Sequence, residues 1–503
     1  MSNTRTNNHY RTKNIVYVSR EQQIWTGQRG ENARVECLAI DPQGKVCFCG
    51  TQQSYTEKFA SPAEIHEVQG SITAGGIDAH NHFWFALLGD IPCVSHLQNA
   101  QQLGEFLQTY AQTCPHDIVF ICNVNNTHEI SQTLLDSCPK PVVAIHRSFH
   151  KAYLNKKAQR LSQITQIPQQ DIINNWQVKN CAMHLLRSEV FAEEYLQKAI
   201  VNFAKKLLQQ GIVCIHDMFI YDVNFLPMIQ KIPIPYRLYA SRNELQKRPD
   251  VQQYFTGVKS FIDGAIGTQT AKFHDNYANT SQNGIFYSSI EQLLEDIDFA
   301  IENSLQTSCH GIGSLGIERI LDVYEMRKDS LIKPRLEHFE CPTERDIDRL
   351  HHIGGIACLQ PNFSQDSYDY ATILGERRKI INPFRQLIDK QVPFATGSDG
   401  MPSGLRECLL WSIKPRYEEQ RMTLQEAMHY STVATTQLAD HEAGLCVGND
   451  ANFVYFSKPL DELHNYPNER ITSNWTELRQ QLDELLPISG IYLQGKCVGD
   501  NDE

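Results

Sequence analysis

The chain has 503 residues, of which 41% are hydrophobic, 46 are Lys or Arg and 58 are Asp or Glu. This length exceeds one ordinary domain, and the hydrophobic content is enough for a buried core. The formal net charge of −12 argues against a broad nucleic-acid surface and against attraction to anionic lipid. A small uncharged or cationic substrate is compatible with this charge.

The sequence offers no sign of export or membrane insertion. Basic residues such as Arg5, Arg11 and Lys13 crowd the start, but no apolar stretch follows them, and no run of about 18 apolar residues occurs anywhere. The 15 cysteines include no C-x-x-C pair, so neither a disulfide framework nor a cysteine-based zinc site is predicted. We expect a cytoplasmic protein with free thiols, a small-molecule substrate and no nucleic-acid or membrane partner; a homodimer stays open.

Both ends of the chain predict short strands separated by turns. Residues 14–19, 34–40 and 45–50 have this character near the start, and residues 451–457 and 490–498 have it near the end. Neither group is large enough to form a stable sheet domain alone. We therefore predict one composite β-sandwich built from residues 1–70 and 440–503.

Between these ends, residues 71–439 alternate between short apolar strands and amphipathic helices, a pattern typical of a parallel sheet with crossover helices. Eight strand candidates can be counted: residues 71–80, 211–218, 234–241, 257–264, 306–313, 334–340, 354–361 and 392–400. Eight strands close a barrel, so the predicted fold class is α/β, a (β/α)8 TIM-like barrel with the small β-sandwich attached. The interval of about 90–205 is too long for one connection and predicts an α/β insertion overhanging the active-site mouth.

His80 and His82 end the first predicted barrel strand. Residues two apart on a strand point to the same face, so both imidazoles could bind one metal ion. A lone His-x-His pair on a strand is usually incidental. The preceding glycines and Asp78, at the strand end, favour a metal site here.

Three further residues end later strands at the same predicted edge. His310 and His338 end the fifth and sixth strands and add two neutral imidazoles. Asp399 follows the eighth strand, where a carboxylate could take a proton from an activated water and return it to a leaving group. The alternative for Asp399 is a turn-forming aspartate before Gly400.

Lys259, on the fourth predicted strand, is the least obvious member of this set. A protonated lysine has no lone pair for a metal, but a buried lysine with a lowered pKa can react with carbon dioxide to form a carbamate. The two carbamate oxygens can bridge two cations. The alternatives are a lysine that reaches the barrel rim or one that pairs with Asp263.

These motifs resemble those of the amidohydrolase superfamily, and more narrowly amidohydrolase family 3, the YtcJ-like metal-dependent hydrolases. The resemblance rests on GGIDAHNHF, VKSFIDGAIG, CHGIG, RLEHFE and GSDGMP, and on HRSFHKAYLNKKA in the insertion. It implies one or two zinc-like cations held by six residues: His80, His82, a carboxylated Lys259, His310, His338 and Asp399. It also implies that His150 and Asn155 face the substrate, with Glu189 as a further substrate-binding candidate.

The expected activity is metal-dependent hydrolysis of a C–N bond in a small amide, N-acyl, N-formyl or cyclic amide compound. Asp399 is expected to act as general acid and base, and the cofactors are expected to be a divalent metal, zinc in the first place, and carbon dioxide for Lys259. Two alternatives remain. Barrels of this type also support isomerases, hydratases and decarboxylases, and a fold can persist as a binding protein without catalysis.

Overall fold

The computed structural model describes residues 13–59, 63–88, 91–125, 128–146, 152–161, 193–472 and 474–498. Within these ranges, no helix combines the length and the apolar character needed to cross a membrane. Every cysteine in them is a free thiol, as the sequence predicts.

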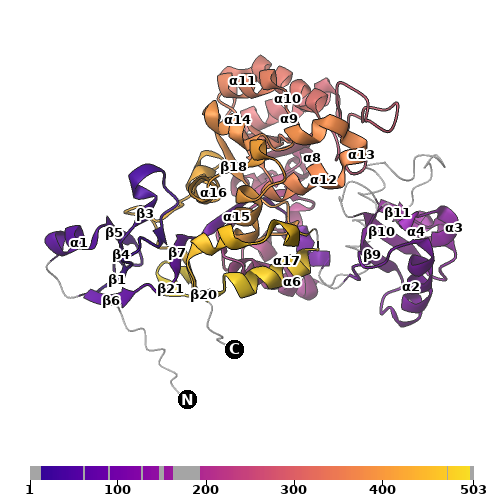
Figure 1. The fold of residues 1–503 in the computed structure, drawn as a ribbon. Coiled ribbons are helices and arrows are strands. Elements are labelled where there is room, and N and C mark those ends of the chain that lie inside the picture. The colour runs from indigo at the N-terminus through magenta and orange to yellow at the C-terminus, as the bar shows by residue number, and fades with distance from the viewer. Residues whose placement is uncertain are drawn as a thin grey trace.

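The centre of the molecule is a parallel sheet of eight strands, each hydrogen-bonded to the next (Figure 1). In order, the strands are β8 (Gly76–Asn81), β12 (Ile212–Ile220), β13 (Tyr236–Ala240), β14 (Gly257–Phe261), β15 (Gln306–Gly311), β16 (Arg335–His338), β17 (Ile356–Leu359) and β18 (Phe394–Thr396). The first and last strands come together at their carboxyl ends, where the backbone N–H of Asp399 donates to the carbonyl of His80 at 2.7 Å. The predicted (β/α)8 barrel is confirmed.

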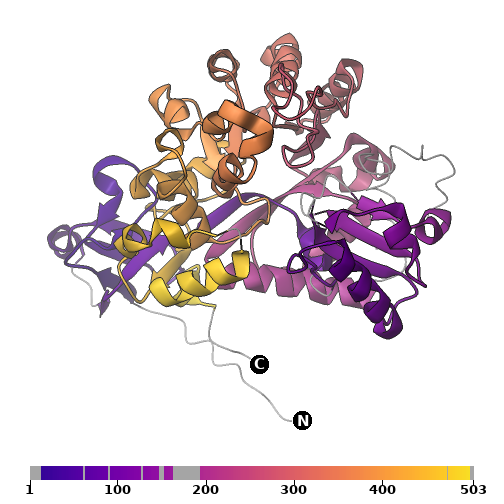
Figure 2. The same ribbon diagram turned by 45° about the vertical axis from the view of Figure 1, so that its right-hand side comes forward.

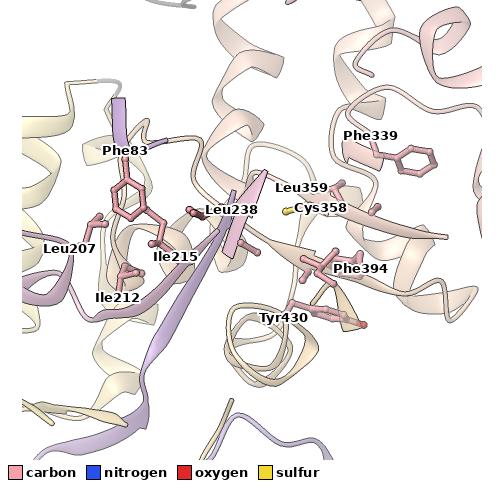
Figure 3. Packing of buried hydrophobic residues seen from close by; sticks show 14 of the residues in the cluster. Phe83, Leu207, Ile212, Ile215, Leu238, Phe339, Cys358, Leu359, Phe394 and Tyr430 are labelled. Atoms are coloured by element: carbon pink, nitrogen blue, oxygen red, sulfur yellow. The ribbon is translucent and has the colours of Figure 1, made fainter. Parts of the chain in front are cut away.

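Helices cover this barrel because their apolar stripes meet the outward side chains of the strands. Among them are α6 (Glu193–Gln209), α9 (Ile290–Glu302), α10 (Ser314–Arg327), α11 (Glu344–His352), α14 (Phe384–Asp389), α15 (Leu405–Ile413) and α16 (Leu424–Tyr430). Figure 3 shows part of the core between these layers, with Phe83 and Leu207 beside Ile215. Phe394 of β18 stacks on Tyr430 of α16, with ring centroids 3.7 Å apart. The core thus holds the strand ends in a rigid frame.

A β-sandwich combines strands from both ends of the chain, as predicted. One sheet has the order β5-β4-β1-β6 and the other the order β21-β20-β19-β7-β2-β3. Its strands are β1 (Asn14–Val18), β2 (Ile24–Trp25), β3 (Arg34–Val35), β4 (Cys37–Ile40), β5 (Val46–Gly50), β6 (Ala63–Glu67), β7 (Ser71–Ala74), β19 (Phe453–Phe456), β20 (Ile488–Leu493) and β21 (Lys496–Cys497). Tyr17, Leu38, Ile72 and Phe453 share one buried cluster, so the two chain ends form a common core.

The structure corrects one strand boundary. The apolar run 71–80, predicted as one barrel strand, is two strands in different sheets: β7 in the sandwich and β8 in the barrel. Gly75 lies between them, and a side chain there would come within 2.5 Å of Val213. Its N–H donates to Asn452 of the sandwich side, whereas that of Gly76 donates to Gly211 of the barrel side. The sequence of residues 71–80 predicts one continuous strand, so it does not show where the chain passes from the sandwich sheet to the barrel sheet.

The segment between β8 and β12 contains a small α/β unit. Its three strands have the order β11-β10-β9, and its elements are α2 (Ala100–Thr113), β9 (Val119–Val124), α3 (Gln132–Asp136), β10 (Val142–His146), β11 (Ala152–Leu154) and α4 (Lys156–Leu161). Leu103, Leu107, Ile121 and Tyr153 belong to its own apolar cluster. Figures 1 and 2 show this unit and the β-sandwich on opposite sides of the barrel.

Candidate active site

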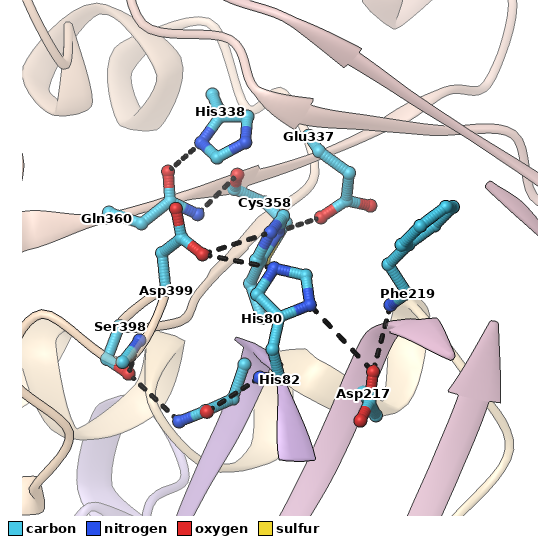
Figure 4. Close-up of polar contacts among 12 residues, drawn as sticks. His80, His82, Asp217, Phe219, Glu337, His338, Cys358, Gln360, Ser398 and Asp399 are labelled. Carbon is cyan, nitrogen blue, oxygen red and sulfur yellow. Dashed lines mark hydrogen bonds and ion pairs between the residues drawn. The ribbon is translucent and has the colours of Figure 1, made fainter. Parts of the chain in front are cut away.

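His80, His82 and Asp399 meet at the carboxyl end of the barrel strands (Figure 4). The Nε2 atom of His82 lies 3.2 Å from Oδ1 of Asp399, and that of His80 lies 3.8 Å from the same oxygen. The backbone at Asp399 has a φ of 53°, in the left-handed region that residues other than glycine seldom adopt. Two ring nitrogens and one carboxylate oxygen within 4.8 Å of one another can hold a divalent cation.

The rings of His338 and His310 complete this group of imidazoles. The ring centroid of His338 lies 4.7 Å from that of His80 and 4.3 Å from that of His310. His338 is held in place by Gln360, whose Oε1 lies 2.7 Å from Nδ1 of His338. Four histidines from three strands, far apart in the sequence, therefore lie at one place.

These imidazoles differ in their electrostatic surroundings. Burial, opposed in part by Glu337, lowers the pKa of His80 to about 4. Burial also lowers the pKa of His338 well below its usual range. At His82 burial acts in the same direction, but Asp217 and Asp399 outweigh it and raise the pKa. His80 and His338 are thus neutral near pH 7, which is the state that offers a lone pair to a metal.

Lys259 carries a buried amine, which lies over the ring of Phe261. Its side chain is 2% exposed, and its Nζ has no hydrogen bond within the described part of the chain. Burial lowers the pKa of Lys259 to about 8. Both structural alternatives for this residue are contradicted: it does not reach solvent, and the carboxylate of Asp263 accepts instead from the backbone N–H groups of Lys272, Ile312 and Gly313. A buried amine with a lowered pKa, beside the histidines, fits a lysine that becomes a carbamate.

Glu337 and Arg335 are residues of the site that the sequence interpretation did not include. Oε2 of Glu337 lies 2.7 Å from Nδ1 of His80, while Arg335 donates to both carboxylate oxygens at 2.7 and 3.1 Å. Burial would raise the pKa of Glu337, but Arg335 and His80 outweigh it and hold the pKa well below the usual range. The sequence could have indicated these two residues, because Arg335 and Glu337 are charged and lie two apart on a barrel strand, which is buried on both faces.

A second group, His80, Glu337 and Cys358, also has ligand atoms close together. It is a poor metal site, because both oxygens of Glu337 already accept hydrogen bonds, including one from Ser308 at 2.9 Å. Burial also raises the pKa of the Cys358 thiol well above its usual range, which opposes the thiolate that a metal needs. The group of His80, His82 and Asp399 is therefore the candidate centre.

Asp217 positions His82 and the segment after it. Its carboxylate accepts from the backbone N–H of Phe83 at 2.6 Å and of Phe219 at 2.9 Å, and its Oδ1 lies 3.8 Å from Nδ1 of His82. Its neighbour in sequence, His216, contacts Arg335 instead, with Nδ1 3.1 Å from Nη1. The end of β12 thus supports the site by hydrogen bonding.

A pocket opens beside His338 and Asp399. Its wall is apolar and aromatic where Phe363, Tyr370, Trp411 and Trp475 line it, and acidic where Glu340, Asp366 and Asp369 do. The pocket gives a small molecule access to the carboxyl ends of the barrel strands, where barrels of this type carry their active sites.

The three predicted substrate contacts belong to the insertion. Asn155 is fully buried there, and its Oδ1 accepts from the backbone N–H groups of Val142 and Ala158 at 3.0 and 2.9 Å. Its Nδ2 donates to the carbonyls of Leu135 and Lys140. These bonds occupy the whole carboxamide within the insertion. His150 and Glu189 lie outside the described residues.

Comparisons with known proteins place the chain in a family. LONG AFTER FAR-RED 3 of Arabidopsis thaliana is 26% identical over 264 residues, which are 48% of this chain and 42% of that protein. The putative amidohydrolase YtcJ of Bacillus subtilis (strain 168) is 29% identical over 233 residues, which are 42% of this chain and 44% of that protein. The chain thus covers less than half of either relative.

A crystal structure of an uncharacterized metal-dependent hydrolase from Pyrococcus furiosus superposes with a TM-score of 0.69 at 18% identity, over 87% of this chain and 97% of that one. At this identity the likeness shows a shared fold. The amidohydrolase family is matched over residues 69–498, most of the sequence, and the chain therefore belongs to that family.

Proposed function

We propose that this protein is a metal-dependent hydrolase that cleaves a C–N bond in a small amide, N-acyl, N-formyl or cyclic amide compound. Family membership supports hydrolysis, and the proposal rests on one observation. Buried histidines and Asp399 converge at the carboxyl end of the barrel, with the pocket beside them. The predicted ligands, which fit zinc or another divalent cation, are His80, His82, His310, His338, Asp399 and Lys259 as a carbamate.

A divalent cation in this group would lower the pKa of a water molecule and polarise the substrate carbonyl. The residues of the chain would carry the proton. Asp399 accepts it from the attacking water and returns it to the nitrogen, because an amine leaves only when protonated. His82 and His80, both within 4 Å of the Asp399 carboxylate, hold that carboxylate toward the reacting atoms.

The experiment is a screen of N-formyl and N-acyl amines and cyclic amides in 18O-labelled water. The metal-loaded protein is compared with Asp399→Asn as the blank. Hydrolysis places one labelled oxygen in the carboxylate product. Turnover without label would instead indicate an isomerase, which has no need to incorporate water, and would reject the proposal.

A further inference from the structure

Glu340 is a buried carboxylate with an unused hydrogen-bonding atom on the pocket wall. It follows β16, two residues after His338, and its side chain is 1% exposed. Its Oε1 has no hydrogen-bond partner within the described residues, although the residue lines the pocket together with His338 and Asp399. A buried polar atom left without a partner is costly, so its presence at a pocket points to a ligand group that satisfies it.

The described charges nearest Glu340 are negative, since its neighbours are the carboxylates of Asp366, Asp263 and Asp399. Asp263 is engaged by three backbone N–H groups, and Asp399 faces the histidines. Of the described residues that line the pocket, none is a lysine or an arginine. Within the described part of the chain, this wall therefore carries no cation.

The rest of the wall suits the body of an organic cation. Phe363, Tyr370, Trp411 and Trp475 line the pocket, and aromatic faces attract an ammonium group through their electron density. Apolar side chains such as Ile266 complete a surface that accepts a short alkyl chain. A molecule with an apolar chain and a protonated amine at one end matches both parts of this wall.

We propose that the pocket selects amides that carry a second, protonated amine, and that Glu340 binds this ammonium group while the scissile C–N bond lies at Asp399. The inference rests on the proposed hydrolysis and names its substrate class, N-acylated diamines and related compounds. The ammonium takes no part in the reaction: water adds across the amide, and a carboxylate and a free diamine leave.

Binding is tested first, without turnover. Calorimetry on the metal-loaded protein compares pentylammonium with its neutral analogue 1-pentanol. We expect the wild type to bind pentylammonium at least about tenfold more tightly, the scale of one hydrogen bond to a buried charge. Glu340→Gln should abolish this preference. Glu344→Gln, an exposed carboxylate at the start of α11, is the control and should keep it.

Kinetics then compare N-acetyl-1,5-diaminopentane with N-hexylacetamide, which has a methyl group in place of the ammonium. The wild-type ratio of kcat/KM should favour the diamine derivative about tenfold, mainly through KM, and Glu340→Gln should bring the ratio close to one. Equal binding of pentylammonium and pentanol, or a preference that survives Glu340→Gln, overturns the inference. Loss of metal from Glu340→Gln also overturns it, because Glu340 would then be a metal ligand. A failure of the proposed hydrolysis alone would give a different result. The protein would still prefer pentylammonium in binding, but it would cleave no amide.

Discussion

The Nδ1 atom of His80 lies 2.7 Å from Oε2 of Glu337, and this contact leaves Nε2 as the ring nitrogen that faces Asp399. Arg335 holds the same carboxylate by two hydrogen bonds and also donates to the carbonyl of Ala79, on the strand that carries His80. The orientation of a candidate metal ligand is therefore set by a buried ion pair from the opposite part of the barrel.

Glu337→Gln should weaken metal binding about 10- to 100-fold, the usual effect of losing the hydrogen-bonded partner of a ligating histidine. It should also destabilise the metal-free protein by roughly 3 to 5 kcal/mol, because Arg335 would remain buried without its counter-ion. Metal titration and thermal unfolding of both forms measure the two effects.

Glu376→Gln serves as the control for Glu337→Gln, since Glu376 pairs with Lys379 on the surface and is 80% exposed. Surface pairs contribute little, so this variant should keep both metal affinity and stability. If Glu337→Gln keeps wild-type metal affinity, the contact with His80 does not orient a ligand.

Lys259→Ala should lose bound metal and activity, and short carboxylates such as propionate should restore part of both, because they can replace the carbamate oxygens. Wild-type protein kept free of carbon dioxide should likewise lose activity and recover it with bicarbonate. The pKa of about 8 means that much of the amine is neutral just above neutral pH, which is the form that reacts. Lys333→Ala, on the surface, is the control. Full activity with an unmodified Lys259 in the metal-loaded protein would exclude the carbamate.

Asp399→Asn and His80→Ala should separate proton transfer from metal binding. Asn at position 399 keeps the size of the side chain but loses the base, so we expect metal to be retained and kcat to fall about 10²- to 10⁴-fold. His80→Ala removes a ring nitrogen and should lose metal as well. Elemental analysis beside initial rates distinguishes the two variants. Full metal and full activity in both would reject the scheme.

The barrel could be predicted from sequence because its signals are local. Each of the eight strands is a short buried run, and the predicted ranges contain or overlap all eight observed strands. The side chains of chemical interest end these runs, and parallel strands in a barrel bring their carboxyl ends to one face. The convergence of His80, His338 and Asp399 follows from that topology alone.

The features that the sequence did not predict depend on contacts between distant segments. Whether Glu337 is a ligand or the support of a ligand depends on its distances to His80 and Arg335, which no spacing encodes. The break at Gly75 depends on which sheet each half of the run joins. That Oε1 of Glu340 has no hydrogen-bond partner among the described residues depends on all its neighbours together. The local sequence pattern therefore predicts where a residue lies in the fold, whereas the role of that residue depends on how distant segments pack around it.

Asn155 provides a test of that distinction, since the sequence predicts a substrate contact and the structure shows a carboxamide bonded to four backbone groups. Asn155→Ala would leave these buried groups unsatisfied and should destabilise the insertion by about 2 kcal/mol or more. Hydrogen exchange should accelerate at the amides of Val142 and Ala158. Asn99→Ala removes an exposed helix cap in the same insertion and should cost only about 1 kcal/mol, with effects confined to α2.

Steady-state kinetics of Asn155→Ala decide between the two roles. A structural residue should change kcat and KM only as far as exchange shows the insertion to be unfolded, so lowering the temperature should restore both together. A substrate contact should instead raise KM while exchange at Val142 and Ala158 stays as slow as in the wild type. A raised KM with unchanged exchange would show that Asn155 contacts the substrate. A side chain that supports four backbone groups cannot be removed without loosening them, so slow exchange would exclude the structural role.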